Sequence, residues 1–342
     1  MSQLIWGEET QFFHSLTPDQ VFKASEILGK RLTGRVLTLN SLENRVYDVE
    51  LAQDLDTNVT PGLSQRNVIV KFYRPGRWSQ EQIKEEHFFL QQLVEFEVPA
   101  IAPLEIGGET LHYDEETKLS FALFPKVQGR LKDELNKEEI DQIGRIIGRV
   151  HNVGSMGNFT KRLNLNTETF IISHHRELQK TSFLSDKQSF RYYLDMLPMV
   201  AQVASPFIDQ LQVQRLHGDF HRGNIVWTST GPMVVDFDDC LTGPCEQDLW
   251  LLFPGKDEYS LTDRERFLSA YKEMTRKDHL KINLVEVFRT MRMIHFNGWI
   301  AKRWDDQSFQ RMFPQFNSDQ YWDQQLLDLR IQLSLIQDIF NF

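Results

Sequence analysis

The sequence predicts an α+β protein with two unequal lobes. Its 342 residues are too many for one ordinary hydrophobic core. Short β-type runs and polar turns fill the first part of the chain, around one amphipathic helix. Helical patterns fill the remainder, with a single β-hairpin among them. We place the boundary near residues 125–130, and assign residues 1–125 to a smaller N-terminal lobe and residues 126–342 to a larger helical lobe.

The first predicted element is a short helix near the N-terminus. Thr17 is a plausible N-cap, and Pro18 suits the first helical position. Gln20 stands where a capping box requires glutamine or glutamate. The helix should run to about Gly29.

The other elements of the first lobe should form a small antiparallel sheet with one inserted helix. Strands are expected at residues 35–39, 45–51, 67–73, 105–107 and 119–124. The inserted helix is expected at residues 79–96, because its apolar residues follow a helical period: Ile83, Phe88, Leu90, Leu93 and Val94.

Beyond residue 130 the pattern is mainly helical. Helices are expected at residues 137–153, 167–181, 187–203, 263–274, 283–304 and 319–338. The hairpin that interrupts them should consist of strands at residues 225–227 and 233–237, joined by a polar turn.

The composition argues against several classes of partner. Lys and Arg number 38 and Asp and Glu number 48, so the formal net charge is −10. We therefore expect no binding to nucleic acid or to an anionic membrane surface. Residues 1–10 lack the apolar run of a signal peptide, and no stretch reaches the ~18 apolar residues of a membrane span. We expect a cytoplasmic protein and, by default, a monomer.

The sequence has two cysteines, Cys240 and Cys245, and the one disulfide they could form would not be enough to stabilise a chain of this length. Their spacing is neither that of a redox pair nor that of a usual zinc site. We interpret them as buried small apolar residues in a reducing cytosol.

The chemistry-bearing residues lie around the predicted hairpin. Asp219 and Asn224 share the loop before its first strand, and Asp236 falls within the predicted second strand. Mg²⁺ prefers oxygen ligands such as carboxylates and amides, so Asn224 and Asp236 could hold it if the hairpin brings them together. Asp219 could then accept the proton of a hydroxyl group that attacks a phosphoryl group.

The order of these residues resembles the catalytic core of the kinase-like superfamily. His217-Gly218-Asp219 precedes Asn224, and Asp236-Phe237-Asp238 follows, as in the branch of aminoglycoside phosphotransferases, choline kinase and homoserine kinase. Longer runs match more narrowly: LNSLENRVY at residues 39–47, VKFYRP at 70–75 and GPCEQDLW at 243–250. They resemble the bacterial stress response kinase A family, a branch described as serine/threonine protein kinases.

This resemblance implies a bilobal protein-kinase-like fold and a kinase that uses ATP and Mg²⁺. It implies Asp219 as the catalytic base, with Asn224 and Asp236 as magnesium ligands and Asp236 as a second catalytic residue. Asp248, with His217, should brace the catalytic loop.

The resemblance also implies the residues that bind the nucleotide. A strand lysine should contact the α- and β-phosphates and pair with a helix glutamate, either Glu86, which we choose, or Glu85. The turn at residues 40–44 should cover the phosphates, and residues 124–127 should form the hinge beside the adenine. The expected set is Ser41, Asn44, Lys71, Glu86, Phe124 and Lys126.

Three departures from protein kinases stand out. The turn at residues 40–44 contains no glycine, although Asn and Ser also form tight turns. No long activation loop separates Asp236 from Asp248, so activation-loop phosphorylation is not expected. Asp238 replaces the glycine that gives the corresponding protein-kinase motif its flexibility.

The sequence leaves the acceptor open. The catalytic residues deal only with ATP and a hydroxyl group, so a protein serine or threonine and a small alcohol or aminoglycoside-like hydroxyl both remain possible. The narrow resemblance favours the protein kinase. Two other hypotheses are a nucleotide-binding protein without activity and a metal-dependent hydrolase built on His217, Asp219 and His221.

Overall fold

The computed structural model describes residues 13, 16–55, 62–208, 210–275, 277 and 280–340. The chain forms two compact units. The first comprises Met1–Arg162, Asp219–Cys240 and Gly255–Arg276, and the second comprises Leu163–Gly218, Leu241–Pro254 and Lys277–Phe342. The predicted lobe boundary after residue 125 stays a prediction.

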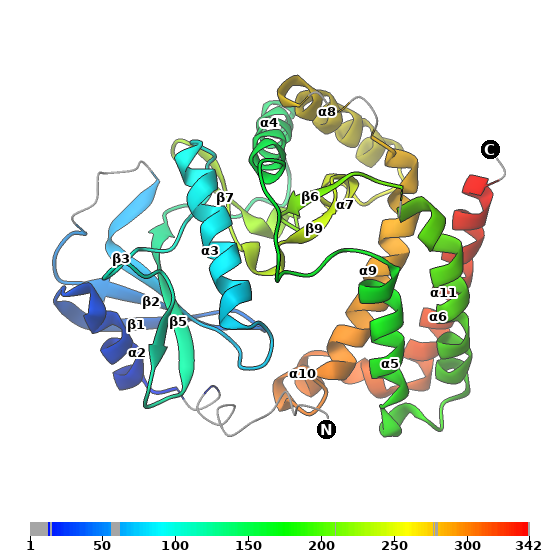
Figure 1. Ribbon diagram of the computed structural model, residues 1–342, viewed down its shortest axis with the longest axis horizontal. Coiled ribbons are helices and arrows are strands. Elements are labelled where there is room, and N and C mark those ends of the chain that lie inside the picture. Colours follow the sequence, from blue (N-terminus) through cyan, green and yellow to red (C-terminus); the bar gives the residue numbers. More distant parts are fainter. Residues whose placement is uncertain are drawn as a thin grey trace. The chain divides into compact units, whose positions relative to one another are not determined.

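An antiparallel sheet is the centre of the first unit (Figure 1). Within the described residues its strands stand in the order β1 (Leu32–Leu39), β2 (Arg45–Leu51), β3 (Leu63–Phe72), β5 (Leu119–Val127) and β4 (His112–Asp114). The register pairs Lys71 with Val46 on one side and with Ala122 on the other. Lys71 therefore lies on the central strand of the sheet, next to the last residue of that strand.

Alternation along β3 gives the sheet two different faces. Val68, Val70 and Phe72 pack into a buried cluster with residues of α2 (Pro18–Ser25). Because successive side chains of a strand point to opposite faces, Lys71 points to the other face. The α2 helix has the predicted capping box at Thr17, and the 3₁₀ turn η1 (Glu26–Leu28) continues it to Gly29, which has φ 64°.

The inserted helix is α3 (Gln80–Glu95), which lies beside the sheet in Figure 1. Ser79 caps it, and Ile83 packs with Ala122 of β5. The predicted apolar face is wrong at two positions. Phe88 and Val94 are exposed. The buried face of α3 instead includes three residues that the apolar pattern left out: Glu86, His87 and Phe89.

Two helices of the first unit, α4 (Lys137–Gly154) and α8 (Glu258–Met274), pack side by side (Figure 1). Gly144 permits their close approach. A Cβ atom at this position would lie 2.6 Å from the Phe267 carbonyl oxygen and 2.8 Å from Ala270 Cβ.

The predicted hairpin is β7 (Ile225–Thr228) and β8 (Gly231–Val234), with Ile225 paired to Val234. The 3₁₀ turn η4 (Arg222–Asn224) precedes it and the turn η5 (Phe237–Asp239) follows it. The predicted strand at residues 105–107 is absent from the structure, where Ile106 makes only an isolated bridge to Glu109.

The second unit is mainly helical. Its helical elements in the described residues are η2 (Glu168–Ile172), α5 (Ser173–Gln179), η3 (Ser182–Leu184), α6 (Gln188–Ile208), α7 (Glu246–Trp250), η6 (Ile282–Leu284), α9 (Val285–Lys302), α10 (Gln307–Met312), η7 (Pro314–Asn317) and α11 (Asp319–Phe340). The second unit also contains a pair of short antiparallel strands, β6 (Val213–Leu216) and β9 (Leu241–Pro244).

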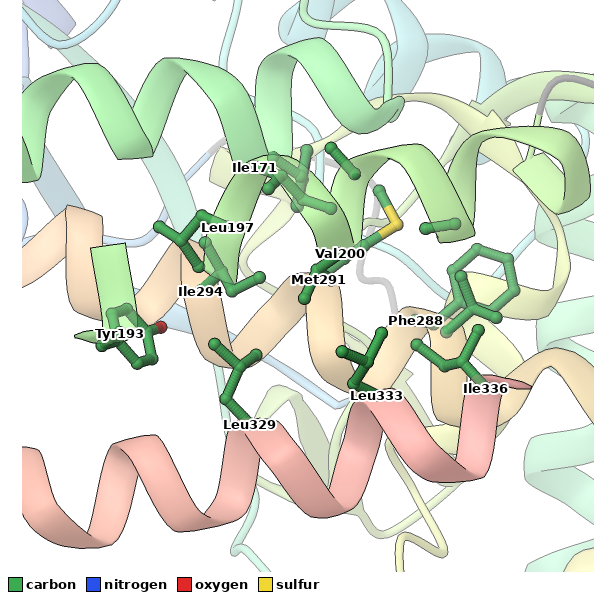
Figure 2. Close-up of a cluster of buried hydrophobic side chains, with 14 of the residues drawn as sticks. Ile171, Tyr193, Leu197, Val200, Phe288, Met291, Ile294, Leu329, Leu333 and Ile336 are labelled. Atoms are coloured by element: carbon green, nitrogen blue, oxygen red, sulfur yellow. The ribbon is translucent and has the colours of Figure 1, made fainter. Parts of the chain in front are cut away.

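Three helices supply much of the core of the second unit, and Figure 2 shows their side chains converging. The contributing residues repeat at helical spacing, which places them on one face of each helix. They include Tyr193, Leu197 and Val200 of α6, Phe288, Met291 and Ile294 of α9, and Leu329, Leu333 and Ile336 of α11.

No helix in the described part of the chain is long and apolar enough to cross a membrane.

Candidate functional site

A cavity of about 610 Å³ lies in the first unit. The turn between β1 and β2, strands β3 and β5, helix α3 and the segment after β8 contribute to its lining. Most of the predicted site residues line it: Ser41, Asn44, Lys71, Glu86, Phe124, Lys126, Asp219 and Asp236. Asn224 is buried and does not belong to this lining.

Lys71 is a buried cation that lines the cavity. Its Nζ lies 2.9 Å from Asp238 Oδ1 and 3.7 Å from Glu86 Oε1. Burial alone would lower the pKa of Lys71. The negative charges of Asp238 and Glu86 outweigh burial, so this pKa lies well above its usual value and the ammonium group stays charged.

Glu86 and Glu85 face different partners. Glu86 approaches Lys71 and lies 2.6 Å from Arg162 Nη2, with both side chains buried. Glu85 instead accepts backbone N–H bonds from Thr160, Lys161 and Arg162. No sequence motif marks Arg162. It lies in an irregular segment after α4, where no periodicity marks a buried arginine.

Arg77 is a second site residue that no sequence motif marks. Its guanidinium group contacts Asp238, and its Nη2 lies 2.6 Å from Asp239 Oδ1. Burial would raise the pKa of Asp238, but the positive charges of Arg77, Lys71 and Arg162 outweigh burial and hold this pKa well below its usual value. Asp238 is therefore a charged structural partner of these cations.

Arg74 holds the turn between β1 and β2. Its Nε donates to the Glu43 carbonyl oxygen at 3.0 Å, and its Nη2 donates to that of Leu42 at 2.9 Å. The Arg74 backbone N–H donates to Asn44 Oδ1 at 3.2 Å, and Ser41 Oγ accepts the Asn44 N–H at 3.2 Å. Side-chain bonds thus fix this turn without any glycine.

Phe124 and Lys126 lie near the end of β5, where a hinge was predicted. Lys126 Nζ lies 2.6 Å from Asp48 Oδ2 of β2, and Asp48 Oδ1 accepts a bond from Asn67 at 2.9 Å. The partner Asp48 was not anticipated, because it faces Lys126 only across the folded sheet.

The loop before β7 presents Asp219. Its backbone carbonyl accepts a bond from Asn224 Nδ2 at 2.9 Å. His221 Nε2 lies 3.3 Å from Asp219 Oδ2, while His221 Nδ1 accepts the Gly223 N–H at 3.0 Å. Among the described residues, no group of three or more His, Cys, Asp and Glu side chains is arranged to hold a metal ion.

The hairpin brings the chain around Asn224 next to Asp236. The Val235 N–H donates to the Asn224 carbonyl oxygen at 3.0 Å. Asp236 has φ 61°, a left-handed conformation that costs a non-glycine residue on the order of 1–3 kcal/mol. The next residue, Phe237, packs edge-on against Phe89 of α3 at a centroid distance of 5.8 Å. This packing helps to hold Asp236 at the cavity.

Asp248 braces the residues that precede Asp219 in the chain. Its carboxylate accepts the backbone N–H groups of His217 and Gly218, each at 2.9 Å. The side chain of Gln247 donates to the Gly218 carbonyl oxygen at 3.1 Å. Cys240 and Cys245 are buried free thiols.

The sequence matches the phosphotransferase enzyme family, APH, over residues 39–282. This match covers more than half of the chain. The chain belongs to the phosphotransferase enzyme family. It is 34% identical to stress response kinase A of Escherichia coli strain K12 over 326 residues, which are 95% of each chain. It is 33% identical to the serine/threonine protein kinase RdoA of Salmonella typhimurium strain LT2, with the same coverage. The predicted resemblance to the stress response kinase A branch is confirmed.

Solved structures of phosphotransferases share the fold. The amicoumacin kinase hAmiN superposes with a TM-score of 0.68 at 18% identity, covering 88% of this chain and 92% of that one. Choline kinase from Cryptosporidium parvum gives a TM-score of 0.63 at 12% identity, covering 94% and 97%. They confirm the predicted α+β kinase-like fold class.

Proposed function

We propose that this chain is a kinase that uses ATP and Mg²⁺ to phosphorylate serine or threonine residues of proteins in a stress response. The curated relatives named above carry such names and match nearly the whole chain. The observation that carries the proposal is the gathering of Lys71, Asp219 and Asp236 around one cavity. Its volume of about 610 Å³ falls within the usual range of small-molecule sites.

The residues present fit a magnesium–nucleotide complex. Asn224 and Asp236 offer amide and carboxylate oxygens, which suit a hard cation. Asp236 forms no ion pair with the described residues, whereas Asp238 is held by Lys71 and Arg77. The amicoumacin kinase of the same fold was solved with AMP-PNP and Ca²⁺.

Bound magnesium–ATP would supply an activated phosphoryl group and the cation that neutralises its charge. Lys71 would bind the α- and β-phosphates, and Glu86 would orient it. Asn224 and Asp236 would hold the metal. Asp219 would orient the acceptor hydroxyl group and accept its proton.

The remaining predicted residues would bind the nucleotide at its two ends. Ser41 and Asn44 would contact the phosphates through the turn that Arg74 fixes. Phe124 and Lys126 would lie at the adenine end. A cytoplasmic monomer stays a prediction.

The test compares acceptors. Purified protein is incubated with γ-labelled ATP and Mg²⁺, alone, with casein or myelin basic protein, and with a panel of small alcohols and aminoglycosides. We expect label on serine or threonine of protein, and none with Asp219→Asn. Label on a small molecule alone would favour the runner-up, a small-molecule kinase, which the choline and amicoumacin kinases of this fold make the natural second candidate.

A further inference from the structure

Arg77 joins three segments of the first unit. It follows β3 by a few residues, and its side chain is only 8% exposed yet lines the cavity. Its two terminal nitrogens contact Asp238 and Asp239 in the turn after β8. Its Nη1 also lies 3.5 Å from Glu43 Oε2 in the turn between β1 and β2. The planar fork of arginine suits such divided contacts.

The contacts of Arg77 bear directly on Asp236. Asp236 has a left-handed backbone conformation that asparagine or glycine would adopt more readily. Such a conformation persists only where the surroundings over-determine it. Phe237 is held by packing against Phe89, and the next two residues are both held by Arg77.

Arg77 also reaches Lys71 through a shared carboxylate. Asp238 Oδ2 contacts Arg77, and Asp238 Oδ1 lies 2.9 Å from Lys71 Nζ. Arg77 therefore fixes the plane of the carboxylate that orients Lys71. A charge-assisted contact on each oxygen leaves this carboxylate little rotational freedom.

We propose that Arg77 is a positioning residue for phosphoryl transfer, which fixes Asp236 through the turn after it and orients Lys71 through Asp238. This inference rests on the proposed function. No long activation loop follows Asp236 in this chain. The contact that orders the turn after Asp236 comes from Arg77, which holds Asp238 and Asp239.

A positioning role predicts a loss of turnover with little change in nucleotide affinity. Arg77→Ala should lower kcat about 10- to 100-fold, because misplacement of reacting groups by about 1 Å has effects of this size. The KM for ATP should change less than about threefold, because Lys71 keeps its pairing with Asp238 and Glu86 in this variant. Arg77→Lys should fall between, since one ammonium group cannot hold both carboxylates in a fixed fork.

The experiment compares wild type, Arg77→Ala, Arg77→Lys and the control Arg66→Ala. Arg66 is an exposed β3 residue paired with exposed Asp54, so its loss should leave kcat unchanged. Millimolar methylguanidinium, but not methylammonium, should partly restore the kcat of Arg77→Ala. Amide hydrogen exchange provides a readout that does not need activity. Residues 237–240 should exchange at least tenfold faster in Arg77→Ala, and α4 should not change.

The outcomes separate this inference from the proposed function. Unchanged kcat, unchanged exchange at residues 237–240, or a kcat loss that methylguanidinium does not relieve would overturn the role of Arg77. A wild-type protein that transfers no phosphoryl group to any acceptor would overturn the proposed function and the catalytic part of this inference. Hydrogen exchange would then still decide whether Arg77 orders the segment.

Discussion

The carboxylate of Asp238 lies 2.9 Å from the ammonium group of Lys71, and their side chains are only 5% and 11% exposed. Removing Asp238 would leave the buried Lys71 with the longer pairing to Glu86, at 3.7 Å. We expect Asp238→Ala to lower the free energy of unfolding by about 3–5 kcal/mol. Asp239 is 47% exposed, so Asp239→Ala should lower it by about 1 kcal/mol at most. Equal losses in urea unfolding would contradict this difference.

Asp248 should matter for both stability and turnover. Asp248→Asn would replace one of two carboxylate acceptors by an amide donor that faces a buried N–H group. We expect a loss of about 1.5–3 kcal/mol in urea unfolding. We also expect a kcat at least tenfold lower. The control is Asp257→Asn at the N-cap of α8, where asparagine caps as well as aspartate. A similar loss in both variants would count against the bracing role.

His87 should make stability depend on pH. It is buried and bonded to the Tyr73 hydroxyl at 2.7 Å and the Thr110 hydroxyl at 2.9 Å. Burial, followed by the charges of Lys71 and Arg162, lowers the pKa of His87 from 6.5 to about 3. The unfolded chain therefore binds a proton that the folded chain does not, as the pH falls below 6.5.

Stability from His87 is thus fully present above pH 6.5 and is lost progressively toward pH 3. Between pH 7 and pH 5 this loss should be about 2 kcal/mol. Urea unfolding of wild type and His87→Gln at both pH values measures it, and the variant should lose about 2 kcal/mol less. Parallel pH dependences would show that His87 is not held neutral.

Gly144 should resist replacement although it lies within a helix. Alanine normally stabilises a helix interior by about 1 kcal/mol relative to glycine. At Gly144 the added methyl group would meet the backbone of α8, so Gly144→Ala should lower the melting temperature by several degrees. The control Gln142→Ala, at an exposed position of α4, should not lower it. A higher melting temperature for Gly144→Ala would refute the close packing.

The sequence predicted those elements whose signals are local. The capping box at Thr17 and the hairpin that begins at residue 225 depend on neighbours in the chain. The short strands β6 and β9 were missed, because they pair with each other across a long stretch of intervening chain. Strand β4 was also missed, although it pairs with the neighbouring strand β5. A hydrophobic pattern also misjudged α3, whose buried face carries Glu86 and His87.

The same contrast applies to the site. Residues on the predicted motifs, such as Lys71, Asp219 and Asp236, line one cavity. Arg77 and Arg162 carry no motif, and an arginine without periodic context is usually exposed. Only the folded chain shows that their charges face the buried carboxylates of Asp238 and Glu86.

Phosphoryl transfer by Asp219→Asn and Asp236→Ala, with ATP binding measured on the same preparations, tests the central claim most directly. Asp219→Asn should bind magnesium–ATP as wild type does and lose most of kcat, because Asp219 acts on the acceptor hydroxyl group. Asp236→Ala should lose turnover together with its response to magnesium. Weakened ATP binding with an intact kcat in Asp219→Asn would contradict the assignment of this site.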